Sequence, residues 1–180
     1  MATVIVADTD EAAHAKLEDY YRYVDLEAAL ALFGGWTGVD LSGADPDSPL
    51  EYVQTEGNQS ALAAFTKLDP SRVWTVRELA RFVAIGGRGP VIVGSPATVV
   101  DELERWLEQG DIDGFNISSA VRPADLNDFV RLVSPELRRR GLLPEEGEAG
   151  RTFRETVLNK GPRLADDHRG AGFRALAEIG

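Results

Sequence analysis

The stretch GSPATVVDELERWLEQGDIDGFNIS, Gly94–Ser118, decides the fold of this chain. Ser95 is a typical helix N-cap, and Pro96 suits the first helical position. Gly110 is expected to close this helix. Short strands are predicted on either side, at Val91–Val93 and at Gly114–Ile117. The buried stripe of the helix is expected to comprise Val99, Val100, Leu103, Trp106 and Leu107.

The N-terminal segment predicts a second strand–helix unit. Ala2–Ala7 is a short β-branched run typical of a buried strand. Asp8 and Glu11 have capping-box spacing, and the helix that they open is predicted near residues 9–30. The segment Gly34–Leu50 is rich in Gly, Pro, Asp and Ser, so it is predicted to be loop.

Two more helices are predicted in the middle of the chain. One spans Gln59–Leu68, and the other is opened by a capping box formed by Thr75 and Glu78. Gly86 and the glycines after it end the second helix and precede a strand. A dinucleotide-binding glycine motif has the reverse order, because it must follow a strand and open a helix. The cluster is therefore interpreted as a plain helix-to-strand turn.

The last part of the chain predicts a final helix and a tail. Pro123 opens a helix, and Arg138–Arg140 is interpreted as its solvated end. Beyond Gly141 the hydrophobic periodicity fades, which indicates an extended tail with one or two short helices. The core face of the helix is expected to comprise Leu126, Phe129, Val130 and Val133.

The predicted fold class is α/β, with about three neighbouring parallel strands at residues 2–7, 90–94 and 113–118. Right-handed crossovers predict that helices near residues 9–30, 96–109 and 123–132 pack on one side of them. The expected organisation is a partial barrel domain over residues 1–140, with an insertion at about 34–74, and a tail over 141–180. A closed (β/α)8 barrel needs eight strands and about 250 residues, so this chain of 180 residues cannot form one alone.

The composition excludes several classes of function. There is no cysteine, which rules out disulfides and thiolate sites. The net charge is −11, and the first 60 residues hold 12 acids against 2 bases. This acidity argues against nucleic acid or an anionic membrane as partner. No apolar run approaches the length of a membrane span, so a cytoplasmic location is expected.

Four stretches together resemble one protein family. They are VIVADTDEAAHAKLEDY, ALFGGWTGVDL, WTVRELARFVAIGGRGPVIVGSPATVVDELERW and DGFNISSAVRPADLNDFVRLVSPELRRRGLL. They resemble, in order, the C-terminal part of the NtaA/SnaA/DszA family of luciferase-like flavin-dependent monooxygenases. The tail departs from the family pattern: EEGEAGRTFRETV lacks the tyrosine that commonly precedes the motif resembled by Arg151–Thr156.

The resemblance implies a TIM barrel that uses reduced FMN, supplied by a separate flavin reductase, to oxygenate a small organic substrate. It implies that the chain begins near the sixth barrel strand and that most of the flavin contacts belong to strands upstream of it. The chain alone is therefore expected to be inactive and to need the missing N-terminal half or a homo-oligomer. The alternatives are a non-enzymatic remnant of the fold that acts as an interaction module, and a free-standing ligand-binding domain.

The candidate site residues lie in three places. The resemblance implies that Gly35, Trp36 and Thr37 belong to a substrate-pocket loop; the alternative is that Trp36 only packs the insertion onto the barrel. Ser95 and Ser118 follow predicted strands and are weak candidates for the flavin phosphate. Their alternatives are a helix cap and an ordinary polar residue at a strand end. No catalytic residue is assigned. His14 and His168 lack metal-site spacing, so no metal is expected.

Overall fold

The computed structural model describes residues 1–144 and 150–173, and the chain divides into two units, Met1–Arg140 and Gly141–Gly180. The extended conformation expected at residues 145–149 and 174–180 lies outside the described residues. The second unit contains the helix α8 and the 3-10 turn η2. The elements of the chain, in order, are β1 (Ala2–Val6), α1 (Asp10–Tyr21), α2 (Leu26–Thr37), α3 (Gln59–Thr66), α4 (Val76–Gly86), β2 (Val91–Gly94), α5 (Pro96–Gly110), β3 (Ile117–Ser118), α6 (Ala124–Asp128), the π-helical segment η1 (Phe129–Val133), α7 (Ser134–Arg139), α8 (Phe153–Leu158) and η2 (Arg169–Phe173).

The sheet has three parallel strands in the order β2-β1-β3, which confirms the prediction of neighbouring parallel strands. In the register, Thr3 lies opposite Val91 on one side and Ser118 on the other. All five residues of the central strand β1 are buried. The third strand is shorter than predicted, because only Ile117 and Ser118 pair with β1.

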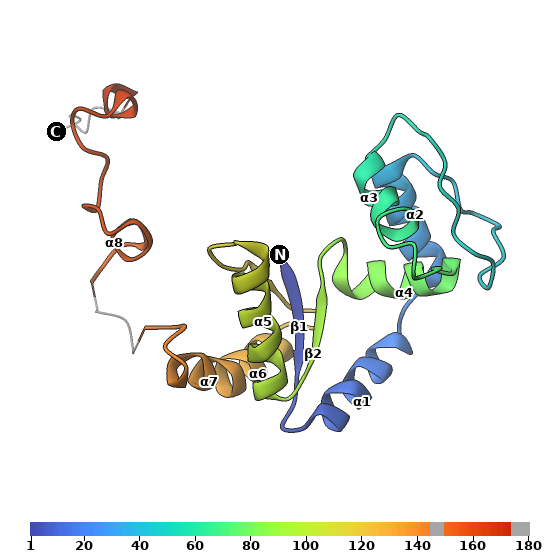
Figure 1. Ribbon diagram of the computed structural model, residues 1–180, viewed down its shortest axis with the longest axis horizontal. Coiled ribbons are helices and arrows are strands. Elements are labelled where there is room, and N and C mark those ends of the chain that lie inside the picture. The colour runs from blue at the N-terminus through green and yellow to red at the C-terminus, as the bar shows by residue number, and fades with distance from the viewer. Residues whose placement is uncertain (145–149, 174–180) are drawn as a thin grey trace. The chain divides into compact units, whose positions relative to one another are not determined.

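Helices cover both faces of the sheet, so the prediction that they lie on one side is wrong. Figure 1 shows α5 on one side of β1 and β2, and α1 and α4 on the other. Because β2 and β3 flank β1 on opposite sides, the two right-handed crossovers run in opposite directions and place their helices on opposite faces. The core of the α5 face comprises Ala2, Val4, Val6, Ile92, Val99, Val100, Leu103 and Val133.

The opposite face of the sheet packs against α1 and α4. The hydroxyl of Thr3 donates a hydrogen bond to the carbonyl oxygen of Ile85 in α4, at 3.4 Å. Val91 and Val93 of β2 face a cavity that residues of α1 and α4 also line. The sheet within Met1–Arg140 is therefore covered by helices of the same chain.

The segment between β1 and β2 has a core of its own. Its helices α2, α3 and α4 surround what we call the insertion cluster, in which the ring of Phe65 makes edge-on contacts with Phe33, Trp74 and Phe82. The capping box of Thr75 and Glu78 is present, as predicted. The buried members of the insertion cluster are Phe33, Val39, Leu50, Leu62, Phe65, Leu79 and Val83.

The first predicted helix is divided in two, and its cap differs. Thr9, rather than Asp8, caps α1 by accepting a hydrogen bond from the N–H of Ala12. A second helix, α2, begins after its own cap at Asp25. It continues through Gly34, Gly35 and Trp36, which were predicted to be loop. Buried apolar contacts of Phe33 outweigh the low helix propensity of the two glycines.

The helix after β3 also differs from its prediction. Leu126 is 50% exposed and Val130 is 59% exposed, whereas Asp125 is buried. The inward face contains Asp125, Phe129 and Val133, which recur at four-residue intervals, and Phe129–Val133 is π-helical. Leu126 and Val130 stand one residue further around the helix and therefore face away from the core.

Candidate functional site

The GGWTG segment forms the end of α2 and the start of the following loop. Gly38 caps the helix at φ 72°, a left-handed conformation that favours glycine. Beside it lies a cavity of about 1030 Å³, with Gly34 and Gly38 in its lining. The apolar part of the lining is completed by Leu26, Leu30, Ala31, Val39, Leu41, Ala44 and Pro46.

Gly35, Trp36 and Thr37 were predicted to belong to a substrate-pocket loop. Two of them, Trp36 and Thr37, make their contacts away from this cavity. Trp36 is partly buried against the insertion cluster, and the guanidinium of Arg88 lies 5.2 Å from the centre of its ring. Thr37 is fully buried; its hydroxyl donates to the carbonyl oxygen of Phe33 at 2.9 Å and accepts from the N–H of Val39 at 3.3 Å. Gly35 is exposed on the helix surface.

The loop that forms the far wall of the cavity is tied to α4. The guanidinium of Arg77 donates two hydrogen bonds to the carboxylate of Asp47, at 2.9 and 3.2 Å. The N–H of Arg77 also donates to the carbonyl oxygen of Pro46 at 2.8 Å. These contacts hold the loop in place, although the loop itself contains no helix or strand.

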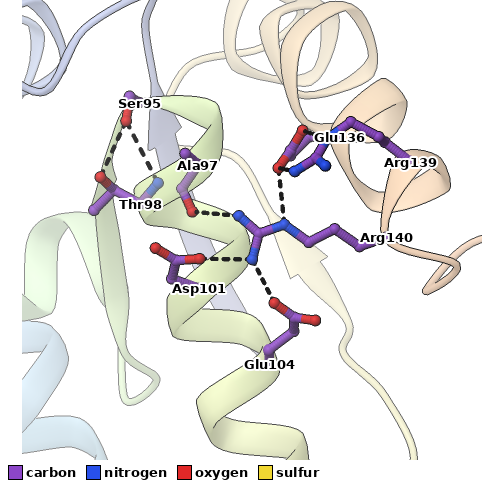
Figure 2. A network of polar contacts seen from close by, with 8 residues as sticks. All are labelled: Ser95, Ala97, Thr98, Asp101, Glu104, Glu136, Arg139 and Arg140. Carbon is purple, nitrogen blue, oxygen red and sulfur yellow. Dashed lines mark hydrogen bonds and ion pairs between the residues drawn. The ribbon is translucent and has the colours of Figure 1, made fainter.

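Ser95 caps α5, as one of the two interpretations predicted. Its hydroxyl accepts a hydrogen bond from the N–H of Thr98 at 3.4 Å and lies 3.0 Å from the hydroxyl of Thr98 (Figure 2). Its own N–H donates to the carboxylate of Asp10 at 2.6 Å. A side chain added at Gly94 would meet Thr98 at 2.7 Å and Asp10 at 2.9 Å. The start of α5 is thus filled by a carboxylate of the chain.

Ser118 lies at a different height in the sheet. It aligns with Thr3 of β1, whereas Gly94, just before Ser95, aligns with Val6. Three residues of strand separate these levels by about 10 Å. One phosphate group cannot contact both serines at that separation. The described residues therefore do not bring Ser95 and Ser118 together, and the carboxylate of Asp10 lies beside the N–H of Ser95. Each serine, taken alone, stays a prediction as a phosphate contact.

A buried polar cluster joins α1 to α6, and no sequence motif predicted it. The Asp125 carboxylate accepts hydrogen bonds from the hydroxyl of Tyr20 at 2.7 Å and from the N–H of Val121 at 2.8 Å. The ammonium group of Lys16 lies 2.8 Å from Asp125 and 2.8 Å from Asp128. The four-residue spacing of Lys16 and Tyr20 is visible in the sequence, but their partner is more than a hundred residues away.

Arg140 lies in a network rather than in a solvated helix end, so that interpretation is wrong for this residue. Its side chain is 17% exposed. Figure 2 shows its guanidinium between α5 and α7, where it contacts Asp101 at 2.6 Å, Glu104, and Glu136 at 2.8 Å. Arg139 also binds Glu136, at 2.6 Å. The spacing of Asp101 and Glu104 on a predicted helix could have indicated an acidic pair able to receive a cation.

The described residues contain no group of histidines and carboxylates that could hold a metal ion. The Nδ1 atom of His14 lies 2.8 Å from the carbonyl oxygen of Asp10, one helical turn earlier. None of the helices in the described part of the chain is long and apolar enough to cross a membrane.

No family model matches the chain. Known proteins do match it. Dimethyl-sulfide monooxygenase from Hyphomicrobium sulfonivorans is 41% identical over 97% of the chain, and nitrilotriacetate monooxygenase component A from Aminobacter aminovorans is 34% identical over 84%. The chain is homologous to part of the luciferase-like FMN-dependent monooxygenases. It spans 36% and 34% of the two enzymes.

Solved structures support the same relationship. The crystal structure of DmoA from Hyphomicrobium sulfonivorans superposes on 97% of the chain with a TM-score of 0.79 and 40% sequence identity, and the match covers 36% of that protein. A riboflavin lyase solved with modified FMN and riboflavin matches 96% of the chain, with a TM-score of 0.71 and 34% identity, over 38% of its own length. The α/β fold with three parallel strands thus corresponds to part of a luciferase-like TIM barrel.

Proposed function

We propose that this chain supplies the insertion side of the substrate pocket in an FMN-dependent monooxygenase that oxygenates a small organic substrate. The observation that carries the proposal is the cavity beside Gly34 and Gly38. The chain that forms it is 41% identical to a monooxygenase over 97% of the chain's own length. The family resemblance implies that the GGWTG segment belongs to a substrate-pocket loop. Gly34 and Gly38 contribute surface to the cavity, and Trp36, which lies between them in the sequence, packs against the insertion cluster.

The remaining two thirds of the enzyme would hold the flavin. Ser95 and Ser118 lie at different levels of the sheet, and the carboxylate of Asp10 accepts the N–H of Ser95 at the start of α5. Flavin chemistry requires an anchored phosphate, an enclosed ring and exclusion of water, all of which depend on surrounding protein. The chain alone is therefore expected neither to oxygenate a substrate nor to bind FMN as an intact relative would. Reduced FMN would come from a flavin reductase.

A chimera tests this proposal. The segment of dimethyl-sulfide monooxygenase that matches this chain is replaced by the corresponding part of this chain, and the product is assayed for FMN binding and for substrate-dependent oxygen uptake with a flavin reductase. We expect both activities in the chimera and neither in the 180-residue chain alone. A chimera that folds and binds FMN but oxygenates none of a panel of sulfides, alkanes and amines would contradict the proposal.

One observation favours the alternative of a non-enzymatic interaction module. Both faces of β1 are covered within the chain, and a second, aromatic core lies in the segment between β1 and β2, so the unit Met1–Arg140 has buried apolar cores without the rest of a barrel. A chimera that folds but fails to bind FMN would favour this alternative.

A further inference from the structure

The cavity beside α2 has charges of only one sign in its lining. Three of its lining residues are acidic, namely Asp25, Glu27 and Asp40, and no lysine, arginine or histidine is among them. Leu26, Leu30, Val39 and Leu41 line the same space with apolar side chains. From this combination we infer that the cavity binds a small organic cation, a substituted ammonium ion with an apolar body.

Backbone hydrogen bonds hold two of the three carboxylates. The N–H of Ser42 donates to the Asp40 carboxylate at 2.8 Å, and contacts with Ser42 lower the pKa of Asp40. Asp25 accepts the N–H of Ala28 at 3.1 Å, which fixes its side chain at the start of α2. Glu27 stands in the same first turn. The positions of the Asp25 and Asp40 carboxylates are thus fixed before a ligand binds.

No cation of the described residues neutralises these three carboxylates. Within residues 1–144 and 150–173, none of them takes part in an ion pair. Arg77, the base that holds the cavity wall, has both of its hydrogen bonds on Asp47. A concave surface with one sign of charge concentrates counter-ions, and its apolar wall strengthens the attraction by excluding water. An anionic ligand would be repelled from the same space.

The apolar part of the lining selects among cations. An inorganic ion would not cover the exposed apolar surface of Leu30 and Leu41, whereas the body of an alkylated amine covers it. The inference concerns binding by this chain and does not depend on the proposed oxygenation. An inactive chimera would not contradict this inference about binding. If the chain does not bind the cation but the chimera is active, the activity would be explained by a neutral substrate.

Isosteric probes test the charge requirement. Benzyltrimethylammonium and its neutral carbon isostere neopentylbenzene are titrated into the 180-residue chain, with phenylacetate as the anion, and binding is followed by ligand-observed NMR. We expect the cation to bind, the neutral isostere to bind more weakly and phenylacetate not to bind. Asp40→Asn and Glu27→Gln should each weaken the cation about two- to fivefold, the size of one partly solvated ion pair. Ala31→Trp should block the cavity and abolish binding.

The control is Glu108→Gln, which removes an equally exposed carboxylate from α5 and should leave the affinity unchanged. Far-UV circular dichroism and thermal melts establish that each variant is folded. Equal affinity for the cation and neopentylbenzene would overturn the inference, as would binding that Asp40→Asn and Glu27→Gln leave intact. The absence of cation binding by a folded wild-type chain would overturn it as well.

Discussion

The carboxylate of Asp10 accepts a hydrogen bond from the N–H of Ser95 at 2.6 Å, although the two residues are 85 positions apart. The contact joins the start of α1 to the start of α5. The parallel pairing of β1 and β2 makes it geometrically available, because both helices begin at the same edge of the sheet. It also gives α5 the negative charge that helix N-termini prefer.

Removal of this carboxylate should destabilise the fold in a pH-dependent way. Hydrogen bonding to the backbone of Ser95 lowers the pKa of Asp10, so its contribution is present at neutral pH and is lost as the pH falls through the lowered pKa. We expect Asp10→Ala to lower Tm at pH 7 and to have a smaller effect as the pH falls into the range where Asp10 is protonated. The control is Asp8→Ala, since Asp8 is exposed and does not cap α1. Equal losses for the two variants at pH 7 would contradict the assigned role.

Asp125 is expected to be the most sensitive charged position. It is 2% exposed and has Lys16, Tyr20 and the N–H of Val121 as partners. Asp125→Ala removes the carboxylate that accepts from the ammonium group of Lys16 and the N–H of Val121. It should lower the free energy of unfolding by about 3 kcal/mol. Tyr20→Phe should lower it by about 1 kcal/mol, because a single hydrogen bond is lost. Urea denaturation measures both, and a loss for Asp125→Ala no larger than that for Tyr20→Phe would argue against the cluster.

The same cluster predicts a loss of stability at alkaline pH. Burial and the hydrogen bond to Asp125 raise the pKa of Tyr20 to about 12. The folded state therefore retains a proton that the unfolded state releases near pH 10, and stability falls as the pH rises through this window. Burial alone would lower the pKa of Lys16, but its bonds to Asp125 and Asp128 outweigh burial and raise it, which acts in the same direction. Tyr20→Phe should flatten the alkaline decrease in Tm, and an unchanged slope would count against this origin.

Local signals in the sequence predicted several elements, and long-range pairs account for much of what was missed. Ser95 with Pro96, and Thr75 with Glu78, were predicted as helix starts, and the structure confirms them. The interactions of Asp10 with Ser95 and of Lys16 with Asp125 join residues 85 and 109 positions apart, and no local pattern specifies them. At Gly34 and Gly35, glycine content predicted loop, but the burial of Phe33 and Thr37 keeps the segment helical.

The Arg140 network should contribute to stability at neutral pH and be lost in acid. Hydrogen bonds from Arg139 and then Arg140 lower the pKa of Glu136 to about 2. A lowered pKa means that the contribution is present above the usual value of about 4.5 and fades as the pH falls toward 2. Arg140→Gln should lower Tm at pH 7 more than Arg139→Gln, because Arg140 also holds Asp101 and Glu104. Equal effects of the two substitutions would show that the contacts with α5 contribute little.

The isolated chain should self-associate through the surface beside β3. Val121, Leu126 and Val130 are 42%, 50% and 59% exposed there, and in the described part of the chain β3 pairs with β1 alone. An unpaired strand edge next to exposed apolar side chains favours association with another chain. We expect sedimentation velocity to show oligomers whose share grows with concentration.

The double variant Leu126→Glu, Val130→Glu should shift the chain toward monomer with little change in Tm, since both side chains already face solvent. Leu68→Glu is the matched control, because Leu68 is 73% exposed and lies in the insertion. A wild-type chain that stays monomeric at all concentrations would contradict the prediction.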